Sequence, residues 1–256
     1  MVGKLGCGCC EVPELCPDVD YLQAFTDDFS PDFEPDWIIS LDYFGTPPES
    51  LIARDGVCSL RGRTTSPFYA VESVGTAYVV AEKTTLTGTV ECQFELAAFP
   101  TSQIVSGRNE ICRAGIGIWS PAESRQLWFE AVNFELPGFV KYHFRDFVYS
   151  QAGGSNLQTI INVTPQVGDV LKLRLSNFTQ DTFFSQDATT STITCLVNDT
   201  PVFSYSQSLR LRKCEFYSGI FMRQHIFQIA RSSSHAGLAY PGLTIAKVDN
   251  FELQSL

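Results

Sequence analysis

The sequence lacks the long apolar segments that membrane-spanning and secreted proteins carry. No uninterrupted apolar run reaches about 18 residues, so we expect no membrane span. The opening residues, MVGKLGCGCC, contain no apolar stretch of about 7 to 15 residues and therefore predict no secretory signal. We accordingly expect synthesis in the cytoplasm.

Clusters of basic residues are also scarce. The chain has 18 Lys and Arg against 28 Asp and Glu, which gives a formal net charge of -10. The tightest basic group is Arg210, Arg212 and Lys213, which we interpret as a solvated strand end. Because phosphate backbones are bound by clustered Lys and Arg, this composition argues against a nucleic-acid partner.

Recognised catalytic motifs are missing too. There is no Gly-x-Ser-x-Gly elbow, no His-Glu-x-x-His helix and no phosphate-binding glycine loop. Glu91 and Glu95 are the best pair of acids on one strand, but four strand residues separate them by roughly 13 Å. Glycoside hydrolysis needs two carboxylates about 5 to 9.5 Å apart. We therefore predict that the protein is not an enzyme.

The sequence is rich in aromatic residues and in short segments where apolar and polar residues alternate. Twenty Phe, nine Tyr and three Trp suit half-buried pleated surfaces, and no segment shows the period of an ordinary helix. Short alternating runs are bounded by turn residues, the clearest at 87–96, 113–119, 126–134, 139–149, 170–175 and 192–197. This pattern predicts an all-β fold, an antiparallel β-sandwich within the usual size of one such domain.

The first part of the chain differs from the rest in charge. Residues 1–55 hold twelve acidic residues and two basic ones, whereas the remainder holds sixteen of each. Residues 1–20 show no strand or helix period and are punctuated by Gly, Cys and Pro. We therefore divide the chain into an N-terminal extended arm, residues 1–20, and one sandwich domain, residues 21–256.

The arm carries a dense group of cysteines, Cys7, Cys9, Cys10 and Cys16. Their spacing matches no known zinc finger, and three states stay open: a thiolate metal site, disulfides within the arm or to a second copy, and free thiols. The other five cysteines lie in or beside strand-like runs, where small buried hydrophobic residues are expected.

Several segments resemble one superfamily. The opening AFTDDFSPDF with Trp37, and the closing LTIAKVDNFEL, resemble the first and last strands of concanavalin A-like lectin/glucanase jelly rolls, including laminin-G-like modules. RAGIGIW, GDVLKLRL and TITCLVNDTPVFSY are similar to the middle strands of that superfamily. The resemblance covers roughly residues 21–253 and implies a jelly roll whose two termini pair in one sheet. Galactose-binding jelly rolls carry similar termini.

The resemblance also bears on ligands. Its hydrolases carry acids at alternate positions of a single strand, and no Glu-x-Asp-x-x-Glu run occurs here. Its modules often hold a structural calcium near the joined termini, which nominates Asp27, Asp28 and Asp249; solvated carboxylates are the alternative. No other cofactor is expected.

Alternation nominates a glycan-binding face on a concave sheet. Aromatic and charged residues suit sugars, whose rings have apolar faces and hydroxyl edges. The candidates are Trp119, Trp128, Glu130, His143, Arg145, Lys172 and Arg174. They share one surface only if their strands are neighbours, and any sheet with one solvated face has a similar pattern.

Three functions follow, in order of preference. The first is a non-catalytic structural subunit of a virion, phage or extracellular surface filament, which docks through its arm onto copies of itself or other subunits. The second is a carbohydrate-binding, lectin-like module. The third is a glycoside hydrolase whose acids come from separate strands.

Overall fold

The computed structural model describes the chain in thirteen segments, residues 24–33, 37–44, 50–54, 56–64, 70–82, 88–99, 108–120, 125–134, 140–148, 156–178, 190–208, 215–228 and 240–255. Every regular element in these segments is a β-strand, and all the strand pairs are antiparallel. The predicted all-β fold is therefore confirmed. The proposed arm lies outside the described residues.

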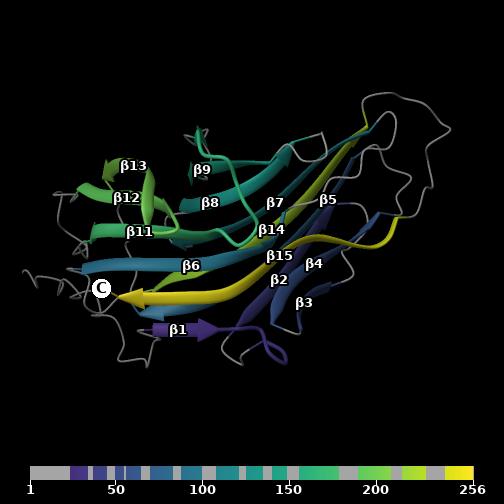
Figure 1. Cartoon of the computed structure of the whole chain (residues 1–256), viewed down its shortest axis with the longest axis horizontal. Coiled ribbons are helices and arrows are strands. Elements are labelled where there is room, and N and C mark those ends of the chain that lie inside the picture. The colour runs from purple at the N-terminus through teal and green to yellow at the C-terminus, as the bar shows by residue number, and fades with distance from the viewer. Residues whose placement is uncertain are drawn as a thin grey trace, which may run out of the picture.

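Two sheets stack face to face (Figure 1). Sheet A has the order β10-β9-β8-β7-β14-β5-β2. Its strands are β10 (Asn156–Ile161), β9 (Val140–Val148), β8 (Arg125–Phe134), β7 (Arg108–Ser120), β14 (Glu215–Gln228), β5 (Ala70–Glu82) and β2 (Ile38–Phe44).

Sheet B has the order β13-β12-β11-β6-β15-β4-β3, with β1 also paired to β15. Its strands are β13 (Thr200–Ser208), β12 (Thr190–Val197), β11 (Val170–Phe178), β6 (Gly88–Ala98), β15 (Tyr240–Ser255), β4 (Val57–Thr64), β3 (Ser50–Arg54) and β1 (Ala24–Asp27). The first and last strands pair directly, Phe25 opposite Leu253, as the resemblance implied.

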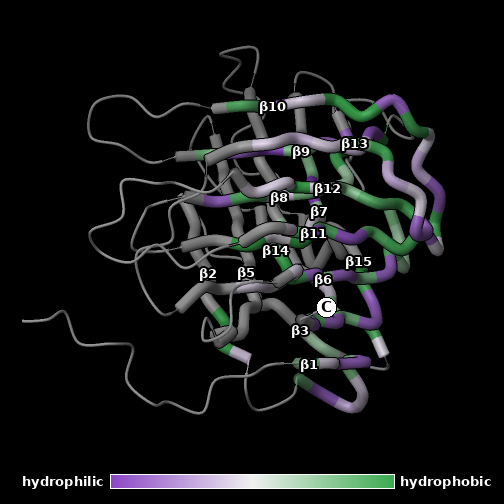
Figure 2. The backbone as a smooth tube through the Cα atoms, turned by 90° about the vertical axis from the view of Figure 1, so that its left-hand side faces the viewer, coloured by the Kyte–Doolittle hydropathy of each residue, from purple (hydrophilic) through white to green (hydrophobic). Residues whose placement is uncertain are grey.

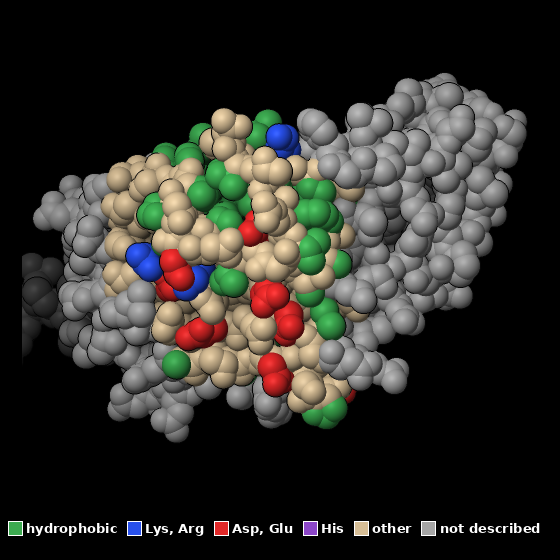
Figure 3. All heavy atoms as spheres, in the orientation of Figure 1, with side chains coloured by type: hydrophobic (Ala, Val, Ile, Leu, Met, Phe, Trp, Pro, Cys, Tyr) green, Lys and Arg blue, Asp and Glu red, His purple; other side chains and the backbone are tan. Residues whose placement is uncertain are grey.

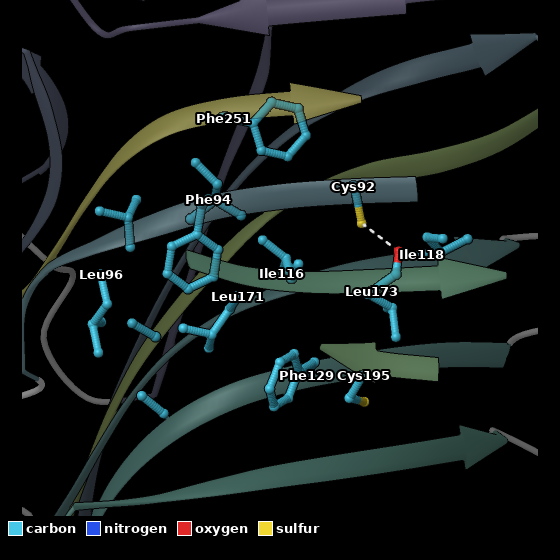
Figure 4. Close-up of a cluster of buried hydrophobic side chains, with 14 of the residues drawn as sticks. Cys92, Phe94, Leu96, Ile116, Ile118, Phe129, Leu171, Leu173, Cys195 and Phe251 are labelled. Carbon is cyan, nitrogen blue, oxygen red and sulfur yellow. Dashed lines mark hydrogen bonds between the residues drawn. The ribbon is translucent and has the colours of Figure 1, made fainter. Parts of the chain in front are cut away.

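The core lies between the sheets and follows the two-residue period of the strands. In β11, Leu171, Leu173 and Leu175 are buried, whereas Lys172 and Arg174 lie on the opposite, outer face. Figure 4 shows side chains from both sheets meeting in this layer. At one edge of the sandwich, where Figure 2 labels β10 and β13 near each other, the rings of Phe144 and Phe203 have centroids 5.0 Å apart.

Four cysteines are part of this core. Cys58, Cys92, Cys112 and Cys195 are buried free thiols, as predicted for the strand cysteines. Cys92 contacts the Leu173 carbonyl oxygen at 3.7 Å. Burial raises the pKa of Cys92 to about 12, so this thiol is protonated at neutral pH. These cysteines act as small apolar groups.

One carboxylate network ties the end of the sandwich together. The buried Asp169 accepts hydrogen bonds from the Tyr142 hydroxyl (2.6 Å) in sheet A and from the Asn198 side chain (2.8 Å) in the β12–β13 turn. Asn198 and Asp199 both have positive φ, 49° and 63°, as a tight two-residue hairpin turn requires. The network thus joins both sheets through one residue.

The paired termini are closed by an aromatic cluster. The Trp37 ring lies 4.8 Å from the Phe251 ring and 5.2 Å from the Phe25 ring, measured between centroids. Asp27 accepts a hydrogen bond from the Trp37 indole N–H and another from the Phe29 backbone N–H (2.6 Å). Both carboxylate oxygens of this buried Asp therefore hold the chain that leads out of β1.

We predict that Asp27→Ala destabilises the fold by about 1 to 3 kcal/mol, because it leaves the buried Trp37 N–H without its acceptor. Asp28→Ala is the matched control, since Asp28 is exposed and accepts a hydrogen bond from the Ser30 backbone N–H (3.0 Å). Thermal unfolding of both variants measures the difference. Equal melting temperatures for the two would contradict the structural role of Asp27.

Candidate functional site

The outer face of sheet A, which points away from sheet B, carries a ladder of polar and aromatic side chains. Strand register sets its rows. The first row holds Arg113, Val132 and Lys141; the second, Phe221, Gly115, Glu130 and His143; the third, Gly117, Trp128, Arg145 and Gln158. We call Arg113, Glu130, His143 and Arg145 the Glu130 cluster.

Two glycines in β7 make room for the ladder. A Cβ at Gly117 would lie 2.2 Å from Cε3 of Trp128, and one at Gly115 would lie 2.7 Å from Cβ of Glu130. Side chains of β8 therefore lie directly against the β7 backbone, where any other residue would collide with them. The Gly-x-Gly in RAGIGIW has this packing role.

Glu130 is fully buried and lies between two guanidinium groups. Arg113 donates from Nη1 to Oε1 at 2.8 Å, and Arg145 donates from Nη2 to Oε2 at 3.0 Å. Nε of Arg145 also lies 2.8 Å from Oε1. A buried carboxylate is costly unless it is paired and hydrogen-bonded, and here both oxygens are engaged. The two guanidiniums are thereby fixed in position.

His143 completes the cluster as a neutral ring. Its Nδ1 lies 2.9 Å from Nε2 of Gln158. Because an amide nitrogen only donates, we assign the acceptor role to Nδ1 and the ring proton to Nε2. Burial is the largest influence and lowers the pKa of His143 to about 4; Arg113 and Arg145 act in the same direction, and Glu130 opposes them.

An aromatic base supports the cluster. The rings of Trp128 and Phe221 lie 4.8 Å apart between centroids, and the guanidinium carbon of Arg145 lies 5.9 Å from the centre of the Phe221 ring. The Trp128 indole N–H donates to Gln126 (3.1 Å). Trp128 is only 4% exposed, so it supports the polar groups from below. The predicted exposed stacking platform is corrected accordingly.

The structure splits the predicted glycan-binding set between two faces. Trp128, Glu130, His143 and Arg145 lie together on sheet A, as the alternation predicted. Lys172 lies on the outer face of sheet B, so it cannot share their surface.

Arg174 is on that same face of sheet B, where Nε lies 2.6 Å from Oε2 of the buried Glu91. Lys172 reaches the same carboxylate at 3.7 Å and Asp199 at 2.7 Å. Trp119 belongs to β7, paired with Gln126, and its side chain lies outside the described part.

Sequence reasoning missed three members of this site. Arg113 alternates with Gly115 and Gly117 in RAGIGIW, a signal that was available but was interpreted only as a strand. Phe221 lies in β14, whose strand was not among the clearest runs. Gln158, on the edge strand β10, carried no distinguishing pattern.

The predicted calcium ligands lie near the joined termini, but their carboxylates have protein partners. Asp27 is held by Trp37 and Phe29. Asp249 accepts from the Asn250 backbone N–H (2.7 Å), and burial raises its pKa, with Glu95 and Asp28 adding to the shift. Within the described segments no three His, Cys, Asp or Glu residues form a group able to hold a metal ion. A calcium site there stays a prediction.

The arm cysteines, Cys7, Cys9, Cys10 and Cys16, fall outside the described residues. In the part of the chain that is described, no helix is long and apolar enough to cross a membrane.

Comparison with known proteins finds similar solved structures. No family model and no curated protein matches the sequence. Among solved structures, an endo-1,3-β-glucanase from Streptomyces sioyaensis is similar, with 13% identity, a TM-score of 0.47, and coverage of 94% of this chain and 99% of that one. A family 16 glycoside hydrolase from Bacteroides ovatus, in complex with an oligosaccharide product, matches with 12% identity, a TM-score of 0.45 and coverage of 91% and 99%.

The carbohydrate recognition domain of Emp47p also matches, with 8% identity, a TM-score of 0.47 and coverage of 91% of this chain and 94% of that one. The jelly-roll fold that the sequence resemblance implied is confirmed by the two stacked antiparallel sheets and by the pairing of the first and last strands.

The same matches overturn two predictions. We expected a non-enzymatic subunit of a virion, phage or filament, whereas the similar jelly rolls are mostly glucanases, with a carbohydrate recognition domain among them. The assembly role and the prediction that the chain is not an enzyme were wrong. At identities of 8% to 14% the matches give information on the fold alone, so the function has to be argued from the site.

We predict that Gly117→Ala displaces Trp128 and destabilises the protein by about 1 to 3 kcal/mol, because the added methyl overlaps the indole. Tryptophan fluorescence and thermal unfolding report the two effects. In a double-mutant cycle, Trp128→Leu should relieve most of the cost. Additive effects would show that the indole is not what the methyl meets.

His143 makes stability depend on pH. Its pKa falls from an ordinary 6.5 to about 4 on folding, so the unfolded chain binds more protons between these values. This contribution to stability is therefore complete above about pH 6.5 and is lost as the pH falls toward 4. Denaturant unfolding across pH 4 to 7 should show a slope that His143→Gln reduces; an unchanged slope would contradict the assignment.

Proposed function

We propose that this protein binds carbohydrate on the outer face of sheet A, at the Glu130 cluster. The observation that carries the proposal is the buried Glu130 carboxylate, which holds Arg113 and Arg145 in fixed positions over an aromatic base. Binding sites gain affinity when their polar groups are preorganised, because no side-chain freedom has to be lost on association.

The groups around the cluster suit sugar hydroxyls. Gln158 is exposed, and Gln126, Lys141 and Arg145 are partly exposed along the same face. Amide, guanidinium and ammonium groups supply donors, and the two amides also supply acceptors. The hydroxyl groups along one edge of a sugar both donate and accept hydrogen bonds. These four side chains form the rim that a saccharide would meet.

Hydrolysis on this face requires more than the described residues provide. Glycosidases use two carboxylates about 5 to 9.5 Å apart. Among the side chains described on the outer face of sheet A, Glu130 is the one acid, and Arg113 and Arg145 both pair with it. The strand register also places Asp42, Glu72, Glu82 and Glu215 on this face, but their side chains lie outside the described part. The described side chains therefore support binding best.

Glycan-array binding tests the proposal. We expect Arg145→Gln to weaken retention by about tenfold, the equivalent of one hydrogen bond to a charged group. Arg174→Gln is a matched control: it removes an Arg from a buried Glu on the outer face of the other sheet. Circular dichroism confirms folding in both.

Two results would decide against the proposal. One is an array on which the wild-type protein retains no glycan; the other is equal loss of binding in Arg145→Gln and Arg174→Gln. Release of reducing sugar from the retained glycan, measured in parallel, would show that the face hydrolyses what it binds.

A further inference from the structure

The edge strand of the candidate site, β10, carries no charged residue and turns two side chains outward. Gln158 lies opposite Arg145, and both belong to the outer face of sheet A. Ile160 lies opposite His143 on the same face. Gln158 is exposed and Ile160 is 62% exposed. The outer face of sheet B differs, since Figure 3 shows acidic side chains there. Strand β10 is therefore an uncharged border of the site.

The buried His143 determines which atom of Gln158 is left for a ligand. Nε2 of Gln158 lies 2.9 Å from Nδ1 of His143, which accepts because the ring is neutral. Within the described part of the chain, the Gln158 side chain makes no other hydrogen bond. The amide nitrogen is thus held by the protein, and the amide oxygen is left as an acceptor at an exposed position. An acceptor oriented in this way selects a ligand group that donates.

Ile160 supplies an apolar contact beside this acceptor. Residues two apart on one face of a strand lie about 7 Å from each other, so one saccharide can contact both Gln158 and Ile160. The aromatic base cannot make this contact, because Trp128 is only 4% exposed. Among the described side chains of the candidate site, Ile160 is therefore the exposed apolar surface against which the C–H face of a sugar ring can pack.

We propose that Gln158 and Ile160 determine the specificity of the site, that His143 is a positioning residue for Gln158, and that the ligand is a neutral saccharide. A sugar hydroxyl donates to Oε1 of Gln158, and the C–H face of the ring packs on Ile160. A carboxylate or sulfate in that place would face the amide oxygen and would have no proton to donate to it. This inference rests on the proposed carbohydrate-binding function and adds its ligand class.

The probes are the neutral and the acidic glycans of one array, applied at low and at high salt. We expect the wild-type protein to retain neutral glycans, and we expect this retention to stay constant as salt rises, because no ion pair with the ligand is screened. Retention of acidic glycans alone would overturn the inference and leave carbohydrate binding intact.

The acceptor is tested by Gln158→Leu. This variant should weaken retention of the neutral glycans about tenfold, because the donating hydroxyl loses its partner. Gln254→Leu is the matched control, since Gln254 also donates to a buried cluster, at Glu91 (3.4 Å), but on the outer face of sheet B. It should leave retention unchanged.

The apolar contact is tested by Ile160→Thr, which keeps the β-branched shape and should weaken retention about fivefold. Val167→Thr is the matched control. Val167 is 56% exposed, and it precedes Gly168, whose backbone N–H donates to the Leu96 carbonyl of sheet B (2.9 Å). This control should bind like the wild type.

The positioning role of His143 is tested by its coupling to Gln158. His143→Leu should weaken retention about as much as Gln158→Leu, and the double variant should lose little more, because His143 acts through the amide. Additive losses would overturn the positioning role. Circular dichroism confirms folding. Gln158 and Ile160 are exposed, so their variants decide the specificity proposal even where His143→Leu does not fold.

The outcomes separate the two proposals. Wild-type retention in Gln158→Leu and Ile160→Thr, together with a loss in Arg145→Gln, overturns the role of β10 and leaves carbohydrate binding intact. Equal losses in Gln158→Leu and Gln254→Leu also overturn this role. An array on which the wild-type protein retains nothing overturns both proposals.

Discussion

A carboxylate removed from water must be held by cations, and on sheet A this requirement organises everything around Glu130. Its two oxygens fix Arg113 and Arg145 on opposite sides. Arg145 in turn lies over the Phe221 ring, and burial, with a smaller contribution from the two guanidinium groups, keeps His143 neutral. None of these side chains occupies its position independently. The cluster is a single electrostatic unit supported by close packing over glycine.

The same motif occurs on the other face with a different result. Glu91 is buried on sheet B and is paired with Arg174 and Lys172, much as Glu130 is paired with Arg113 and Arg145. There, however, Lys172 also forms an ion pair with Asp199, at 2.7 Å. A buried Glu–Arg pair by itself therefore does not mark a site. On sheet A, by contrast, the described partners of the buried Glu are two guanidinium groups, one of which lies over an aromatic ring.

The sequence predicted well which residues of a strand share one face, but it predicted poorly which strands are adjacent in a sheet. Two-residue alternation placed Trp128, Glu130 and His143 on one face, and the register of β8 and β9 confirms it, because a short connection makes these strands adjacent. Alternation carries no information about which distant strands pair. Strand β7 pairs with β14, about a hundred residues later, and β11 lies in the other sheet. Phe221 therefore escaped prediction, and Lys172 was assigned to the wrong surface.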